Sequence, residues 1–215
     1  MANISGTTDN DFSEGTVGKD TIRGADSNDF LFGLEGDDSI RGDAGSDALF
    51  GGNDIDILLG GNDNDLLDGG IGADTLRGGS GSDQLIGGEG LDSLVGESGN
   101  DTLYGGLNND TLTGSSGDDV LQGGAGEDRI DGGSGSNIVY GGDDADLFVL
   151  TSGGNSKIMD FADGSDKISL GSGLNFDSLD IQDNNGDTEI INSNGEVIGL
   201  ISNTASSDLT ATDFA

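Results

Sequence analysis

Apolar residues recur at every ninth position over two thirds of the chain. The period runs from Gly6 to Val149 without an insertion or deletion, which makes sixteen copies of nine residues. Position eight is apolar in fifteen of these copies, and Ser13 in the first copy is the exception. A period this strict predicts a stacked repeat architecture in which each copy places one apolar side chain in a shared core.

Glycines and one aspartate complete each copy. Position one is Gly in all sixteen copies, and position six is Asp in every copy except the one that holds Asn137. We expect the glycines at positions one, two and four to take positive φ and to turn the backbone tightly. Positions seven to nine predict a three-residue strand whose middle side chain points inward. Strands this short must stack into sheets along the axis of the array.

The aspartates at position six are the candidate metal ligands. Carboxylate oxygens combined with main-chain carbonyls suit a hard cation, and calcium accepts six to eight such oxygens with loose geometry. The candidates are Asp11, Asp20, Asp29, Asp38, Asp47, Asp56, Asp65, Asp74, Asp83, Asp92, Asp101, Asp110, Asp119, Asp128 and Asp146.

The nonapeptide resembles the repeat of the RTX (repeats-in-toxin) family. The best-formed copies read Gly78-Gly-Ser-Gly-Ser-Asp-Gln-Leu-Ile86 and Gly123-Gly-Ala-Gly-Glu-Asp-Arg-Ile-Asp131. The resemblance implies an all-β fold, a right-handed parallel β-roll with two nonapeptides per turn. It also implies calcium between the loops of copies n and n+2, which pairs each position-six residue with the one 18 positions on. Of fourteen such pairs thirteen are Asp–Asp, so we expect up to about thirteen calcium ions, with Asp119–Asn137 the weakest site.

The formal net charge of −35 bears on stability. Carboxylates stacked a strand spacing apart repel each other by about 1 kcal/mol even in water. The metal-free roll should therefore be unstable, and calcium binding should supply the folding free energy. Two other interpretations are a disordered Gly/Asp-rich linker and a polar array that holds no metal. The apolar residue at every ninth position disfavours the first, and the stacked carboxylates disfavour the second.

Composition also limits the classes of function. The chain has no Cys and no His, so disulfides, thiolate sites and the commonest general base are absent. No HExxH motif or nucleophile–base pair can be built, and repeat-locked carboxylates are more typical of ligands than of a glycosidase pair. We therefore expect no enzyme activity. Strong acidity disfavours nucleic acid and anionic membranes, and no apolar stretch is long enough for a membrane span. The N-terminus carries no signal-peptide pattern.

Residues 150–215 depart from the nine-residue period. Apolar segments at 157–161, 167–170, 179–181, 188–191 and 196–201, with Asn-Gly turns at 185–186 and 194–195, predict a small antiparallel β cap. The text around Asp160-Phe-Ala-Asp-Gly-Ser-Asp-Lys-Ile-Ser-Leu170 is similar to the end of serralysin-type RTX proteins. That similarity implies a cap and an uncleaved signal for a type I ABC exporter, although the ending Asp213-Phe214-Ala215 departs from the usual tail. The expected organisation is a tail (1–5), the roll (6–149) and the cap with secretion signal (150–215).

The sequence therefore predicts a secreted, extracellular calcium-binding RTX protein that folds on binding calcium outside the cell. The alternatives are an adhesion or surface-layer module, and a detached C-terminal module of a larger exported enzyme. Besides calcium and an exporter, we expect a surface, glycan or self-association partner through an aromatic stripe on one sheet. The stripe is formed by the position-nine residues Phe32, Phe50, Tyr104 and Tyr140. Strand propensity alone would also select aromatic residues there.

Overall fold

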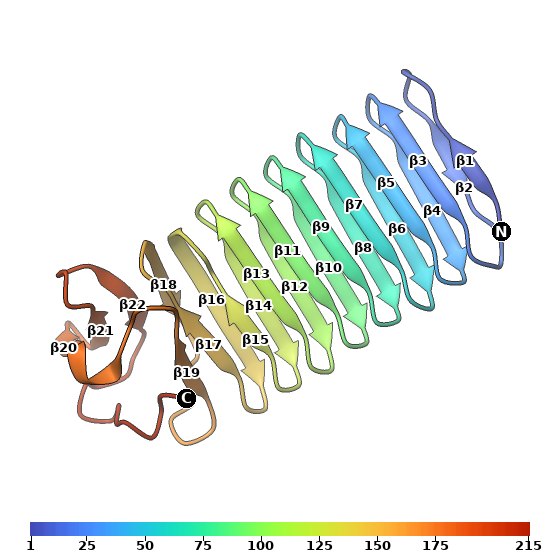
Figure 1. Cartoon of the computed structure of the whole chain (residues 1–215). Helices are drawn as coiled ribbons and strands as arrows, with labels where there is room; N and C mark the ends of the chain where they lie inside the picture. The colour runs from blue at the N-terminus through green and yellow to red at the C-terminus, as the bar shows by residue number, and fades with distance from the viewer.

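The computed structural model describes residues 1–215 as a β-solenoid closed at its C-terminal end by a smaller β unit. The strands lie side by side along one axis, with the N-terminus at one end of the roll and the cap at the other (Figure 1). The elements are β1 (Asn3–Ser5), β2 (Phe12–Glu14), β3 (Thr21–Asp26), β4 (Phe30–Glu35), β5 (Ser39–Ala44), β6 (Ala48–Asn53), β7 (Ile57–Asn62), β8 (Leu66–Ile71), β9 (Thr75–Ser80), β10 (Gln84–Glu89), β11 (Ser93–Ser98), β12 (Thr102–Leu107), β13 (Thr111–Ser116), β14 (Val120–Ala125), β15 (Arg129–Asp131), β16 (Gly135–Asp143), β17 (Leu147–Leu150), β18 (Gly154–Ile158), β19 (Lys167–Leu170), a short 3-10 helix η1 (Phe176–Ser178), β20 (Asp180–Asn184), β21 (Asp187–Ile191) and β22 (Val197–Ile201).

Two parallel sheets form the roll. Strands β1 to β19 with odd numbers make one ten-stranded sheet, and the even strands β2 to β18 make the other, which continues through β22, β21 and β20. Each strand pairs in parallel with the strand 18 residues further on, as Leu85 does with Leu103. Two nonapeptides therefore complete one turn, which confirms the predicted all-β parallel roll.

The strands are longer than the three residues that the sequence predicted. Most cover six residues, from position seven of one copy to position three of the next, as in β10. The reason is the glycine at position one, which stays extended, whereas positive φ occurs at positions two and four, as in Gly70 and Gly72. The prediction of positive φ at position one was wrong, and this glycine continues the strand.

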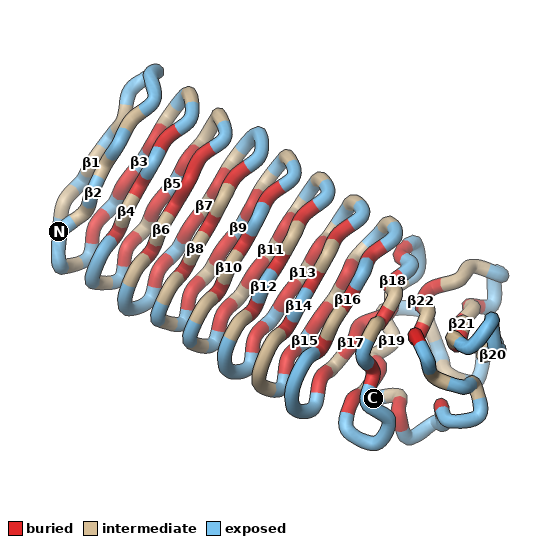
Figure 2. Tube along the Cα trace, turned by 180° about the vertical axis from the view of Figure 1, so that it is seen from behind, coloured by how far each residue is buried: buried red, intermediate tan, exposed pale blue.

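A single column of apolar side chains fills the space between the sheets. All fifteen apolar position-eight residues are buried, and most have no exposed surface. Along the six-residue strands the position-eight residue and the next position-one glycine are the buried positions, as in β9, and only β6 buries a third residue, Ala48. Figure 2 shows the result as buried bands that repeat from turn to turn along the roll. Because the core is only one side chain wide, the position-six residues lie directly beside it.

Parallel stacking continues beyond residue 149, where the nine-residue period ends. Strand β18 pairs with β16, and β19 pairs with β17, both in parallel. The apolar core also continues, through Leu150, Ile158 and Ile168, which are fully buried. The roll thus has one further turn that the period alone does not reveal.

The C-terminal unit is an antiparallel meander attached to the even sheet. Strand β22 pairs in parallel with β18, and β21 pairs antiparallel with both β22 and β20. Asn185 and Gly186 join β20 to β21 with positive φ at both positions, as the Asn-Gly signal predicts. Ile190, Ile198 and Ile201 are fully buried and extend the core of the roll. The fold has no helix with the length and apolar character to cross a bilayer.

Candidate metal-binding sites

The position-six aspartates lie inside the roll. Fourteen of the fifteen predicted ligands are buried, and none of these exposes more than 4% of its surface. The remaining one, Asp11, is half-buried near the N-terminal end. Carboxylates are seldom buried without a partner, because removing a charge from water is costly. The side chains therefore need neutralising or hydrogen-bonding groups within the roll.

One oxygen of each carboxylate is held by the backbone. The N–H of each position-six residue donates to Oδ1 of the residue 18 positions on, over 2.8 Å from Asp29 to Asp47 and 2.7 Å from Asp56 to Asp74. All fourteen residue pairs predicted from the 18-residue spacing make this contact, including Asp119 with Asn137 at 2.9 Å. We call this chain of contacts the aspartate ladder. It fixes the orientation of every carboxylate in it.

The other oxygen, Oδ2, is buried without a hydrogen-bond partner in thirteen aspartates. Leaving a buried charged acceptor unpaired is strongly unfavourable, so thirteen unpaired carboxylate oxygens make these positions candidate sites for a cation. They belong to Asp29, Asp38, Asp47, Asp56, Asp65, Asp74, Asp83, Asp92, Asp101, Asp110, Asp119, Asp128 and Asp146.

A main-chain oxygen lies beside most of the unpaired Oδ2 atoms, as the site around Gly69 shows. A methyl group added to Gly69 would stand 2.6 Å from Oδ2 of Asp74 and 2.8 Å from the carbonyl oxygen of Gly87. The glycine at position one therefore keeps open a space that is lined by a carboxylate and a carbonyl oxygen. Nowhere do three acidic side chains gather around one point. Carbonyl oxygens would have to complete the coordination, and this mixed donor set suits calcium.

Burial makes these carboxylates weak acids. Desolvation, reinforced by repulsion from Asp83, Asp47 and Asp63 and opposed by the hydrogen bond from Asp47, raises the pKa of Asp65 to about 8. Desolvation likewise raises the pKa of Asp56 and Asp110 to about 7. Near neutral pH such groups need either a proton or a cation. A divalent ion would remove the repulsion and the unpaired charge together.

At the N-terminal end of the ladder, protein hydrogen-bond donors contact Oδ2. The N–H of Thr7 donates to Oδ2 of Asp11 over 2.6 Å, and the hydroxyl of Thr16 donates to Oδ2 of Asp20 over 2.8 Å. Burial by itself would raise the pKa of Asp20, but hydrogen bonds from Ala2 and Thr16 outweigh it and lower the pKa to about 2. Asp11 and Asp20, both predicted ligands, thus differ from the other thirteen.

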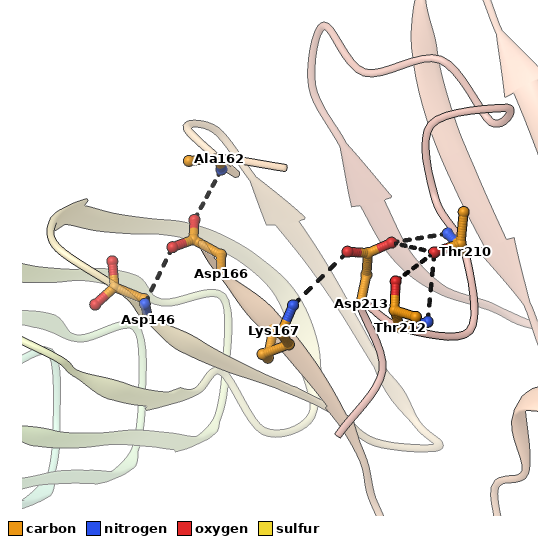
Figure 3. Close-up of polar contacts among 7 residues, drawn as sticks. All are labelled: Asp146, Ala162, Asp166, Lys167, Thr210, Thr212 and Asp213. Atoms are coloured by element: carbon orange, nitrogen blue, oxygen red, sulfur yellow. Dashed lines mark hydrogen bonds and ion pairs between the residues drawn. The ribbon is translucent and has the colours of Figure 1, made fainter. Parts of the chain in front are cut away.

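The ladder has a further member that the sequence interpretation missed. Asp166 is buried, accepts the N–H of Asp146 on Oδ1 over 3.0 Å, and accepts the N–H of Ala162 on Oδ2 over 2.8 Å (Figure 3). Residues 161–169 form a degenerate copy with Asp at position six and Ile168 at position eight. Its signal was obscured because the spacing from Asp146 is 20 residues and Phe161 replaces the first glycine.

Beyond Asp166, an ion pair lies at the end of the ladder. Lys167 contacts Oδ1 of buried Asp213 at 3.8 Å, and the N–H of Thr210 donates to its Oδ2 over 2.8 Å (Figure 3). The backbone N–H of Ile168 donates to the carbonyl of Asp213 over 2.7 Å. The last residues of the chain therefore pack against the last strand of the odd sheet.

Asn137 differs from its neighbours as the sequence suggests. It accepts the N–H of Asp119 with its amide oxygen, which places the amide nitrogen where the aspartates have Oδ2. That nitrogen is buried without a partner, and Ser156 occupies the corresponding position on the next strand of the sheet. An amide donor cannot bind a cation. The ligand set at this step of the ladder is therefore poorer than elsewhere.

The predicted aromatic stripe is divided by the structure. Phe32 and Phe50 stack at a centroid distance of 4.8 Å. Strands that carry Asp68 and Ile86 separate Phe50 from Tyr104, and the strand of Gln122 separates the two tyrosines. Phe12 extends the phenylalanine end at 5.3 Å from Phe32. A partner for these side chains stays a prediction.

Comparison with known proteins identifies the family. The RTX calcium-binding nonapeptide repeat matches residues 5–40, 23–58, 41–76, 50–85, 77–112 and 113–148, which together span two thirds of the chain. The chain therefore belongs to the RTX calcium-binding repeat family. Among curated protein sequences, none matches.

The solved structures that match this chain include the crystal structure of extracellular lipase LipA from Serratia marcescens, with 17% sequence identity and a TM-score of 0.42. The match covers 94% of this chain and 39% of the lipase chain, so this chain spans about two fifths of that protein's length.

Proposed function

We propose that this chain is an exported calcium-responsive module, which folds when the aspartate ladder binds calcium outside the cell. The observation that carries the proposal is the set of thirteen buried Oδ2 atoms without partners. Together with the raised pKa values of the ladder, it describes a fold whose interior requires cations. Binding free energy would then be folding free energy.

Extracellular calcium concentrations suit such a switch. Extracellular calcium modules bind with dissociation constants of about 0.1–1 mM, whereas cytosolic sensors bind far more tightly. A chain with affinities in the weaker range stays unfolded inside the cell, which favours passage through an exporter. It then folds where calcium is abundant. The secondary support for export is the similarity of the C-terminal segment to serralysin-type ends. We propose no enzyme activity for the roll.

Circular dichroism across a calcium titration tests the proposal. The chain in EDTA should be coil-like and should become β-rich through a cooperative transition at millimolar calcium. Magnesium at equal concentration is the control for charge screening, because it demands a stricter octahedral geometry and gives up water reluctantly. A β-rich spectrum in EDTA above about pH 8, where the ladder carboxylates are charged, would contradict calcium-driven folding. Equal folding in magnesium would show that screening alone is sufficient.

The adhesion alternative rests on the exposed aromatic residues. Phe12 and Phe30 expose 69% and 53% of their surface on the even sheet, next to the stacked Phe32 and Phe50. Replacing Phe32, Phe50, Tyr104 and Tyr140 with Thr keeps strand propensity and removes the rings. Reduced self-association in sedimentation, or reduced surface binding, would support the adhesion role. Unchanged sedimentation and surface binding would indicate that the aromatic side chains only stabilise the strands.

A further inference from the structure

A hollow on the outer face of the odd sheet is lined by three of the seven basic residues in the chain. Arg23, Arg41 and Arg77 stand at position nine of β3, β5 and β9, and the hollow between them measures about 480 Å³. The rest of the molecule is acidic, with 42 Asp and Glu residues. The hollow therefore has a local charge opposite to that of its surroundings.

Two acidic side chains hold the arginines in place. Asp43 pairs with both Arg23 and Arg41, and Glu97 pairs with Arg77, whose Nε lies 2.7 Å from the carboxylate. Both acids occupy position two, where φ is +79° and +76° and most later copies have glycine. The left-handed conformation is unfavourable for residues that carry a side chain. The strained positions place a carboxylate at each end of the hollow.

The centre of the hollow is apolar. Leu59 is the position-nine residue of β7, between Arg41 on β5 and Arg77 on β9. The adjoining position-two residues Gly61 and Gly79 add no side chains to fill the space. Two strand spacings, about 10 Å, separate the strands of Arg41 and Arg77. The result is a half-buried leucine with a guanidinium on either side.

Hydrogen-bonding capacity remains on the arginines. The contacts of Arg23 and Arg41 with Asp43 use their Nε atoms, so the Nη groups of these two arginines stay available, whereas Arg77 contacts Glu97 through both Nε and Nη2. Three guanidinium groups and two carboxylates leave a local charge of about +1. Paired Nη donors match the two oxygens of a carboxylate. The arginine donors, the local positive charge and the apolar side chain of Leu59 together suit a ligand with one carboxylate and one apolar group.

We propose that this hollow binds a small monocarboxylate that carries an apolar group. The carboxylate receives hydrogen bonds from the Nη groups of Arg41, Arg77 adds positive charge on the other side, and the apolar group covers Leu59. A single negative charge matches the local charge, whereas a polyanion is repelled by the net charge of −35. Nucleic acid is further disfavoured because no aromatic side chain lines the hollow for base stacking. The proposal depends only on the folded odd sheet and is separate from calcium binding.

A titration of the folded chain with hexanoate tests it, with the arginine Nε–H signals followed by NMR in calcium buffer. We expect saturable shifts, and a dissociation constant about tenfold larger for Arg77→Gln and for Arg41→Gln. Leu59→Ser should also weaken hexanoate binding. Arg129→Gln removes a cation on β15, outside the hollow on the same sheet, and should leave the affinity unchanged. Circular dichroism of each variant confirms that the roll is folded.

Any one of four outcomes would overturn the proposal. Shifts that never saturate, or equal weakening by Arg129→Gln, would show that the arginines act only as surface ion pairs. Inorganic phosphate binding as tightly as hexanoate, with no effect of Leu59→Ser, would contradict the apolar part of the ligand. Binding of a short single-stranded oligonucleotide more tightly than hexanoate would show that the hollow is a nucleic-acid site and not a monocarboxylate site. None of these results would alter the calcium titration, so the two proposals fail independently.

Discussion

The backbone N–H of Asp47 donates to Oδ1 of Asp65 over 2.8 Å and leaves Oδ2 of Asp65 buried without a partner. The same contact repeats along the roll, so one side chain both links two successive turns and presents an unpaired anionic oxygen. Removing the carboxylate would leave the link intact only if an amide replaced it. Asn137 shows that the ladder accepts this replacement.

Asp65→Asn should therefore keep the fold in excess calcium but weaken its response. We expect the variant to bind at least one calcium ion fewer and to need more calcium for half-folding. The amide nitrogen left unpaired should reduce stability in calcium by about 1–3 kcal/mol. Native mass spectrometry and a calcium titration measure both effects. The control Asp180→Asn changes the same charge on an exposed residue of β20 and should behave as the parent. Equal effects of both variants would mean that only net charge matters.

Asn137→Asp should have the opposite effect. It restores the Oδ2 atom that the ladder lacks at this step, beside Ser156. We expect one additional bound ion and folding at a lower calcium concentration. In EDTA the same substitution should destabilise the roll, because it adds a buried charge. An unchanged ion count in native mass spectrometry would contradict this prediction.

Gly69→Ala tests the need for glycine at position one. The added methyl group would stand within 2.8 Å of both Oδ2 of Asp74 and the carbonyl oxygen of Gly87, so these oxygens must move. We expect a loss of at least about 1–3 kcal/mol in calcium, as for overpacked interiors. Gly18→Ala is the matched control, because no atom lies within 4 Å of its added methyl group. Thermal melting compares the two, and a neutral Gly69→Ala would count against the oxygen-lined space.

Acid should stabilise the metal-free roll. Burial raises the pKa of Asp65 to about 8 and that of Asp146 to about 7, whereas an unfolded Asp titrates near 3.9. The folded state then binds more protons than the unfolded state between these values, so stability in EDTA should rise as pH falls from about 8 to about 4. In calcium the trend should reverse, because protons compete with the ion. Melting curves at several pH values, with and without EDTA, check both signs.

Deleting residues 151–215 separates the two proposed roles of the C-terminal segment. The deletion removes β18 and β19, which cover the last turn of the roll, and exposes the core at Phe148 and Leu150. We expect impaired folding in calcium and loss of export by a type I exporter. Folding at the parent calcium concentration would contradict the capping role. Continued export of the truncated chain would contradict the signal role.

The sequence predicted the roll well because one period controls both its core and its ladder. An apolar residue at every ninth position fixes the inward column, and two copies per turn bring Asp47 beside Asp65. The length of the strands was not predicted. Gly69 and its equivalents were expected to adopt positive φ and end the strand, but their backbone is extended and the strand continues through them. Their role is to make room for a neighbouring carboxylate, which depends on packing rather than on backbone freedom.

Two other features, Asp166 and the arginine hollow, bring together residues whose spacing differs from the 18 residues of one turn. Asp166 was missed because two extra residues shift it from the 18-residue spacing. The arginine hollow was missed because Arg23 and Asp43 lie 20 residues apart in copies on adjacent strands. Only the stacking of position nine beside position two brings such residues together.

A crystal structure of the chain grown in calcium tests the central claim most directly. The account predicts cations within about 2.3–2.6 Å of the Oδ2 atoms that lack protein partners, from Asp29 to Asp146. It also predicts a weak or absent cation beside Asn137, and protein hydrogen bonds rather than cations on Oδ2 of Asp11 and Asp20. Cation-free Oδ2 atoms along an otherwise intact roll would contradict the account.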